Sequence, residues 1–127
     1  MKDIMSHVPQ APVEQITADQ LDALIAGKLF TIIDVRSPEA IESQGEIPTA
    51  INIPLNTMDQ VLEEDSNDKH EVFYSDRPLL FCCTGGVMSY VAALKASNKG
   101  IGQLHNLEGG HSAWKKLREA KATSEAA

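Results

Sequence analysis

The chain has 127 residues, 43% of them hydrophobic, which suits one domain built around a single core. Its 18 acidic and 11 basic residues give a formal net charge of −7 without a basic cluster, which argues against nucleic acid as a partner. No apolar stretch approaches the length needed to cross a bilayer, which argues against a membrane-embedded protein.

The N-terminal residues have the composition of an arm that precedes a folded domain. Prolines and scattered charges interrupt any periodicity in residues 1–15, which also lack the continuous apolar core of a secretory signal. We therefore expect a flexible arm over residues 1–15, one domain over residues 16–119 and a tail over residues 120–127. The same observation predicts a cytoplasmic location, unless a signal has already been removed from this sequence.

Capping and apolar residues predict a helix followed by a strand at the start of the domain. Thr17 and Gln20 have the spacing of a capping box, an apolar stripe follows them, and Gly27 is the expected end of the helix. The β-branched apolar run over residues 30–33 then predicts a buried strand.

Polar residues follow this strand directly. Asp34 and Arg36 form a possible charge pair at its end, for which we favour a structural, supporting role. Ser37 has the position of a helix N-cap, with Pro38 in the first helical position. Further along, the pattern predicts a short strand over residues 50–53, a helix from Asn56, and a solvated loop over the charged residues 63–71.

The most informative stretch covers residues 79–89, where an apolar run, a glycine-rich loop and the start of a helix follow one another. Cys83 lies where the strand would end, so the loop N–H groups and the helix N-terminus would point at its sulfur and form an anion site. The thiolate is the nucleophilic form of cysteine, and a helix N-terminus favours that form. These residues alone leave two interpretations of Cys83 open, a nucleophile or a small buried core residue. The candidate anion-binding loop consists of Thr84, Gly85, Gly86, Val87, Met88 and Ser89.

The alternation of strands and helices predicts an α/β fold, a small parallel sheet with helices on both faces. A last strand is expected over residues 103–107, followed by a glycine turn and a helix over residues 111–119. In such sheets the sites form beyond the carboxyl ends of the strands. Four candidate residues lie near predicted strand ends: Asp34, Asn52, Cys83 and Asn106.

The two cysteines, Cys82 and Cys83, are adjacent and do not form a disulfide framework, because a bridge between neighbours would be strained. We expect both thiols to be reduced. The four histidines are scattered and show no ligand spacing with the cysteines, so neither a metal site nor a cofactor is expected.

Three segments in this order resemble single-domain rhodaneses, the sulfurtransferases that carry sulfur as a cysteine persulfide. They are residues 34–39, 45–54 and 106–114, and the resemblance spans residues 16–117. The loop of this family has the pattern Cys-x-x-Gly-x-Arg followed by Ser or Thr, and Cys83, Gly86 and Ser89 occupy its first, fourth and seventh places. Cys82 fits this pattern less well and is expected to be a buried strand residue, with a resolving role as the alternative.

The resemblance implies covalent catalysis in which Cys83 takes sulfur from a small-molecule or protein donor and passes it to a thiol acceptor, without a cofactor. The loop N–H groups would stabilise the thiolate and persulfide anions. For the Ser89 hydroxyl, we favour capping of the helix over donation to the sulfur.

Met88 departs from the family pattern, because it stands where the family often has arginine. A thioether supplies neither the charge nor the donors that bind an oxyanion, so we expect weak thiosulfate activity and a persulfide-type donor. Arg36 and Arg77 are the open candidates for replacing the lost charge. The alternative function is a catalytically quiet module that binds a partner or senses oxidants or sulfide.

The fold that the resemblance implies is shared with some phosphatases and arsenate reductases, which hold their oxyanion with an arginine. That arginine follows the cysteine after five intervening residues, and here this position is Ser89. The sequence therefore argues against either of these activities.

Overall fold

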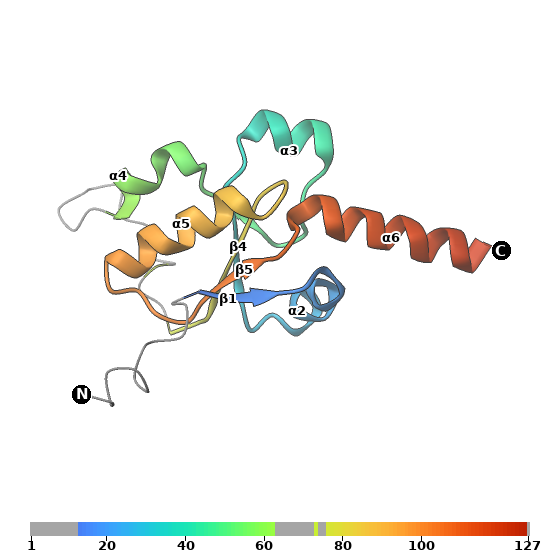
Figure 1. Cartoon of the computed structure of the whole chain (residues 1–127), viewed down its shortest axis with the longest axis horizontal. Helices are drawn as coiled ribbons and strands as arrows, with labels where there is room; N and C mark the ends of the chain where they lie inside the picture. The colour runs from blue at the N-terminus through green and yellow to red at the C-terminus, as the bar shows by residue number, and fades with distance from the viewer. Residues whose placement is uncertain (1–12, 63–72, 74–75, 127) are drawn as a thin grey trace, which may run out of the picture.

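The computed structural model describes residues 13–62, 73 and 76–126 (Figure 1). Its strands are β1 (Val13–Ile16), β2 (Thr31–Asp34), β3 (Ile51–Asn52), β4 (Leu79–Cys82) and β5 (Leu104–Leu107). Its α-helices are α2 (Leu21–Gly27), α3 (Pro38–Gln44), α4 (Met58–Leu62), α5 (Val87–Asn98) and α6 (Gly110–Ala126). Short 3-10 turns, η1 (Ala18–Gln20) and η2 (Leu55–Thr57), precede α2 and α4.

The described strands form one parallel sheet in the order β1-β5-β4-β2-β3. β4 lies at its centre, with Cys82 opposite Asp34 of β2 and Phe81 opposite Asn106 of β5. Because neighbouring strands run in the same direction, the carboxyl ends of β2, β4 and β5 meet at one edge of the sheet.

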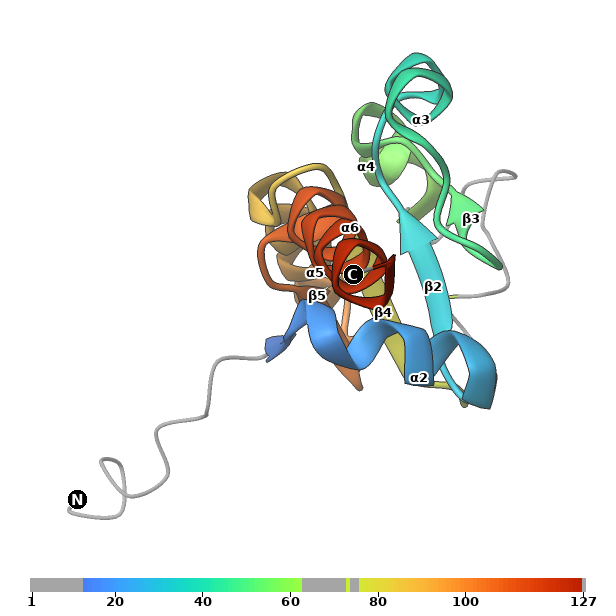
Figure 2. The same ribbon diagram turned by 90° about the vertical axis from the view of Figure 1, so that its right-hand side faces the viewer.

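Helices cover both faces of the sheet, as Figure 2 shows, and each face has its own core. Side chains alternate along a strand, so Phe81 and Cys83 point into the core beneath α4 and α5. Leu80 and Cys82 point into the opposite core, which α2 and α6 cover. The predicted α/β fold with helices on both faces is confirmed.

Both ends of the domain differ from the expectation. Val13 and Ile16 are buried and β1 pairs with β5, so the sheet already includes Val13, three residues before the predicted start of the domain at residue 16. Two apolar residues three positions apart do not have the period of a strand, so the sequence pattern gives no signal for β1. At the other end α6 continues to Ala126, where a tail was expected, and extends beyond the sheet (Figure 1).

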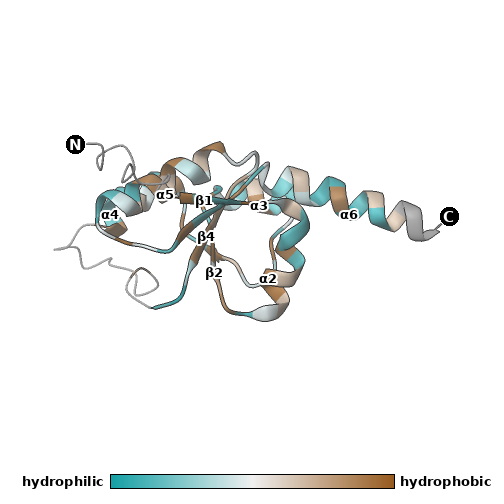
Figure 3. Ribbon diagram, turned by 60° about the horizontal axis from the view of Figure 1, so that its bottom comes forward, coloured by the Kyte–Doolittle hydropathy of each residue, from teal (hydrophilic) through white to brown (hydrophobic). Residues whose placement is uncertain are grey.

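Most side chains of α6 from Lys115 to Ala122 are exposed, so this part of the helix buries little surface. Figure 3 shows the corresponding alternation of hydrophilic and paler bands along this helix. The predicted arm over residues 1–12 and the predicted loop over residues 63–71 lie outside the described residues.

Local signals placed the helix starts well. The Thr17 N–H donates to Gln20 Oε1 at 3.1 Å, and Ser37 Oγ accepts from the N–H of Ala40 at 3.1 Å. Lys28, after the predicted stop, takes the left-handed conformation with φ 57°. The helix expected from Asn56 instead begins as η2 and continues as α4. Of the helices described, none is both long and apolar enough to cross a membrane.

Candidate active site

Cys83 lies directly after β4, with 2% of its surface exposed, and three donor groups surround its sulfur. The N–H groups of Gly86 and Ser89 donate to Sγ at 3.1 and 3.3 Å, and Ser89 Oγ lies 3.2 Å from the same atom. Two backbone N–H groups that point at one sulfur stabilise negative charge on it, and the Ser89 hydroxyl lies within reach of the same atom. The loop N–H groups thus point at the Cys83 sulfur, and the role of this loop as an anion site stays a prediction.

The start of α5 places these donors. Gly86 is its N-cap with φ 91°, and a Cβ there would lie 2.9 Å from the Gly109 nitrogen and 3.0 Å from the Leu107 oxygen. Only glycine fits this conformation and this space. Val87 is the first helical residue, so Ser89 lies in the third position and does not cap the helix. Its Oγ faces Cys83 and, at 2.5 Å, Asn106 Oδ1, so the expectation of capping is wrong.

The N-terminus of α6 holds the other side of the loop. The N–H of His111 donates to the Cys83 carbonyl at 2.8 Å, and that of Ser112 donates to the Thr84 carbonyl at 3.0 Å. A Cβ on Gly110 would lie 2.5 Å from each of these two carbonyl oxygens, so the approach requires glycine. The sequence pattern predicts only a turn at Gly109 and Gly110 and gives no signal for this contact, because it joins residues far apart in the chain.

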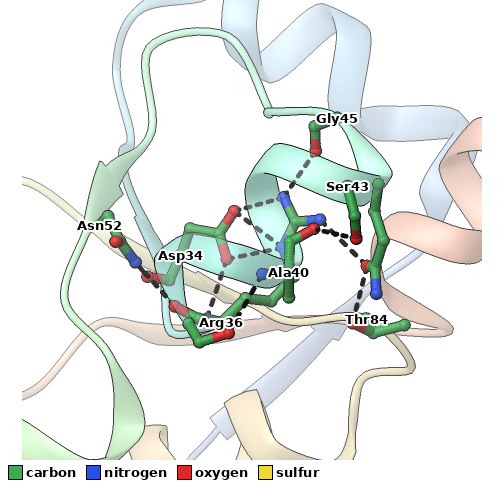
Figure 4. A network of polar contacts seen from close by, with 9 residues as sticks. Asp34, Arg36, Ala40, Ser43, Gly45, Asn52 and Thr84 are labelled. Atoms are coloured by element: carbon green, nitrogen blue, oxygen red, sulfur yellow. Dashed lines mark hydrogen bonds and ion pairs between the residues drawn. The ribbon is translucent and has the colours of Figure 1, made fainter.

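Asp34 and Arg36 form a buried ion pair beside the loop, with 2.6 Å between Arg36 Nη2 and Asp34 Oδ2 (Figure 4). Arg36 Nη1 also donates to Gln44 Oε1 at 3.2 Å, and the Thr84 hydroxyl donates to the same oxygen at 2.9 Å. Arg36 therefore reaches the loop only through Gln44, which no sequence motif marked. Asn52 braces the same turn by donating to the carbonyls of Asp34 and Arg36, both at 2.9 Å.

The four residues expected to meet at the strand ends thus divide into two groups. Cys83 and Asn106 share contacts with Ser89, whereas Asp34 and Asn52 belong to the ion-pair network. Both groups lie at the predicted edge of the sheet.

Neither candidate replaces the arginine that is missing at Met88. Arg36 is 2% exposed and engaged by Asp34. Arg77 donates to the carbonyls of Leu29 and Phe30 at 3.3 and 3.4 Å, at the end of the sheet where β2 begins. The expectation that one of them could supply the charge is therefore wrong.

The rim of the loop is apolar and open to solvent. Val87, Met88 and Val91 are 74%, 48% and 40% exposed. Met88 also lines a groove of about 290 Å³ with Val35, Ser37, Pro54, Leu55 and Asn56, none of which is charged. The described side chains at this rim are thus apolar or uncharged.

Cys82 differs chemically from its neighbour. Burial raises the pKa of the Cys82 thiol well above its usual value, and the nearby Asp34 charge raises it further. Its side chain packs in the core opposite Cys83, so it is a buried strand residue, as expected. No group of three or more His, Cys, Asp or Glu side chains among the described residues could hold a metal ion.

Comparison with known proteins agrees with this geometry. The family model described as "Rhodanese-like domain" matches residues 17–117. A mouse protein named "Thiosulfate sulfurtransferase/rhodanese-like domain-containing protein 3" is 33% identical over 104 residues, which are 78% of this chain and 66% of the relative. A protein named "Sulfurtransferase" from Allochromatium vinosum is 29% identical over 111 residues, 87% of this chain and 89% of the relative.

Solved structures show the same fold. A protein of unknown function from Rhodopseudomonas palustris, described as a possible tyrosine phosphatase, superimposes with a TM-score of 0.79 at 28% identity. The match covers 84% of this chain and 82% of that one. Together, the family match over residues 17–117, the parallel sheet and the cysteine loop show that the chain belongs to the single-domain rhodanese-like sulfurtransferase family.

Proposed function

We propose that this protein transfers sulfur through a persulfide on Cys83. The observation that carries the proposal is the position of Sγ, which receives N–H groups from Gly86 and Ser89 at 3.1 and 3.3 Å. The Cys83 thiolate attacks the outer sulfur of a donor, forming a sulfur–sulfur bond while the donor's remaining group leaves with the electron pair of the broken bond. An acceptor thiolate then attacks the terminal sulfur, and Cys83 leaves as a thiolate.

The loop suits both steps of this cycle. The two N–H groups at Sγ stabilise Cys83 as nucleophile and as leaving group. The first N–H groups of any helix have no partner inside it, so the first turn of α5, from Val87, offers donors to a charged terminal sulfur.

The rim supports a persulfide of a thiol as donor over thiosulfate. Thiosulfate carries two negative charges, and binding its sulfonate end calls for a cation with several donors. Met88 supplies neither, and Arg36 is buried against Asp34. The exposed Val87 and Met88 suit a donor with an apolar or uncharged body. Thiosulfate turnover is accordingly proposed to be weak, whatever the activity of the relatives that carry its name.

A second candidate function is a catalytically quiet module that binds a partner or senses oxidants or sulfide. The exposed side chains of Val87, Met88 and Val91 favour it, because an apolar patch on a helix can bind another protein. The two N–H groups that donate to the Cys83 sulfur favour the enzyme.

The test is intact-protein mass spectrometry after incubation with a small-molecule persulfide and, separately, with thiosulfate. Wild type, Cys83→Ser and Cys82→Ser are compared, each folded and reduced. We expect added sulfur from the persulfide in wild type and Cys82→Ser but not in Cys83→Ser, with onward transfer to cyanide or a thiol. Absence of added sulfur from both donors in wild type would contradict the transferase and support the binding or sensing module.

A further inference from the structure

A buried chain of polar contacts runs from Cys83 through Ser89 to Asn106. Ser89 Oγ lies 3.2 Å from Cys83 Sγ and 2.5 Å from Asn106 Oδ1. Asn106 Nδ2 donates to the Gly86 carbonyl at 2.9 Å and to Gln15 Oε1 at 3.0 Å. Ser89 and Asn106 are 0% and 1% exposed, so water cannot substitute for these partners.

The Gly86 carbonyl determines which way the Asn106 amide faces. A carbonyl oxygen only accepts hydrogen bonds, so the group of Asn106 that lies against it is the NH₂. Oδ1 therefore faces Ser89, and because Oδ1 has no proton, the hydroxyl proton of Ser89 occupies the 2.5 Å contact. A serine hydroxyl has a single proton, so this proton is then not available to the sulfur.

With Cys83 as a neutral thiol, every group in this chain has a partner. The sulfur accepts from the N–H groups of Gly86 and Ser89, and its S–H donates to Ser89 Oγ, whose O–H donates to Asn106. With Cys83 as a thiolate, the sulfur has no proton to give, and the Ser89 hydroxyl can serve it only by turning away from Asn106. That turn leaves Oδ1 buried without a donor, which costs free energy.

We propose that Asn106 is a positioning residue that competes with the Cys83 sulfur for the Ser89 proton. Asn106 thereby makes the thiolate less stable than the loop alone would make it. Whenever the sulfur is a thiol or the inner sulfur of a persulfide, the Ser89 hydroxyl donates its hydrogen bond to Asn106. The Ser89 hydroxyl then serves the sulfur only at the two stages at which Cys83 is a thiolate. This deepens the proposed function, but it is tested by alkylation and not by sulfur transfer, so that either can fail alone.

Other titratable or charged groups lie in the elements packed around Cys83. They are the same in every variant compared. They come from each element packed against the loop: Cys82 on β4, the paired Asp34 and Arg36 beside β2, Tyr90 on α5, and His111 on α6. The experiment compares the effect of Ser89→Ala on the pH of half-maximal rate in two backgrounds, so the contribution of these groups cancels.

The experiment measures the rate of Cys83 alkylation by iodoacetamide against pH, with the modified cysteine assigned by mass spectrometry. Four proteins are compared: wild type, Ser89→Ala, Asn106→Leu and the double variant. In the Asn106→Leu background the Ser89 hydroxyl is free to donate to sulfur, so Ser89→Ala should raise the pH of half-maximal rate by about one unit. In the wild-type background the same substitution should raise it by less than half as much.

Asn106→Leu also removes the hydrogen bond from Asn106 to the Gly86 carbonyl. That bond is absent from both Asn106→Leu and the double variant, so its effect cancels when the two are compared. Gln15→Leu removes the other acceptor of the Asn106 amide and should leave the effect of Ser89→Ala as in wild type. Should Asn106→Leu fail to fold, Asn106→Ala replaces it in the same cycle. A Ser89→Ala shift that is equal in the two backgrounds, or larger in wild type, would overturn the proposal.

Discussion

At the scale of single residues, the adjacent Cys82 and Cys83 have different surroundings, because successive side chains along β4 point to opposite faces of the sheet. Cys82 faces the core beneath α2 and α6, and burial raises its pKa, so its thiol stays protonated and unreactive. Cys83, one residue later, points to the other face and into a ring of donors. In the proposed function, Met88 then limits which anions Cys83 can accept, because it is half-exposed at the rim without charge or donors.

We expect Met88→Arg to raise kcat/KM for thiosulfate with cyanide as acceptor by about tenfold, since one hydrogen bond to a charged group contributes roughly 1.5–3 kcal/mol. The guanidinium would supply planar hydrogen-bond donors for thiosulfate, which the wild-type rim does not offer. Steady-state kinetics with thiosulfate and with a persulfide donor measure the change.

Val91→Arg is the matched control, because Val91 is exposed on the same helix and its replacement adds the same charge. It should leave thiosulfate turnover close to wild type. An equal gain in both variants would attribute the effect to net charge, and no gain in Met88→Arg would remove the assigned role of this position.

At the scale of elements, the N-termini of two helices meet at the loop and hold different groups. The first turn of α5 points its N–H groups at the Cys83 sulfur, whereas α6 donates N–H groups to the carbonyls of Cys83 and Thr84. Gly110 makes the second contact possible, because any larger residue would collide with both carbonyls. The loop thus has its conformation set from both sides before any substrate binds.

Gly110→Ala should therefore displace the loop and slow alkylation of Cys83 at least tenfold. It should also destabilise the fold by about 1–3 kcal/mol, because its φ of 64° is left-handed and the new Cβ overpacks the site. Alkylation rates and urea unfolding measure the two effects. Gly27→Ala is the control, since a Cβ at Gly27 meets nothing within 4 Å and its φ is not positive. Reactivity in Gly110→Ala that matches the control would show that α6 does not position the loop.

At the scale of the whole molecule, the site lies where three central strands end, and buried polar groups connect it to the rest of the fold. His111 is 3% exposed, its ring lies 5.7 Å from that of Trp114, and its backbone N–H donates to Cys83. Burial lowers the pKa of this imidazole, and the neighbouring Arg36 charge lowers it further. The folded protein therefore disfavours the protonated form of His111.

Stability should consequently fall as the pH decreases below the unfolded histidine pKa of about 6.5, because the unfolded chain then binds a proton that the folded chain excludes. Between pH 7.5 and 5.5 we expect this group to contribute a loss of stability, which His111→Gln should abolish. Urea unfolding of both proteins at the two pH values measures it. The same loss in wild type and variant would contradict the prediction.

The local part of this protein was readable in its sequence because each signal acts over a few residues. Apolar runs identified β2 and β4, and the caps at Thr17 and Ser37 marked the start of two helices. The glycine loop indicated that N–H groups would point at the Cys83 sulfur, as they do in the structure. The missing charge at Met88 was visible in the same way.

Only the tertiary structure decided what depends on contacts between distant residues. It placed Ser89 between Cys83 and Asn106 and not at a helix cap, and it buried Arg36 against Asp34, where it cannot bind a substrate. It also added β1 to the sheet through its pairing with β5. Sequence periodicity records which face of an element is apolar, but which residue of another element meets that face is settled only when the chain packs.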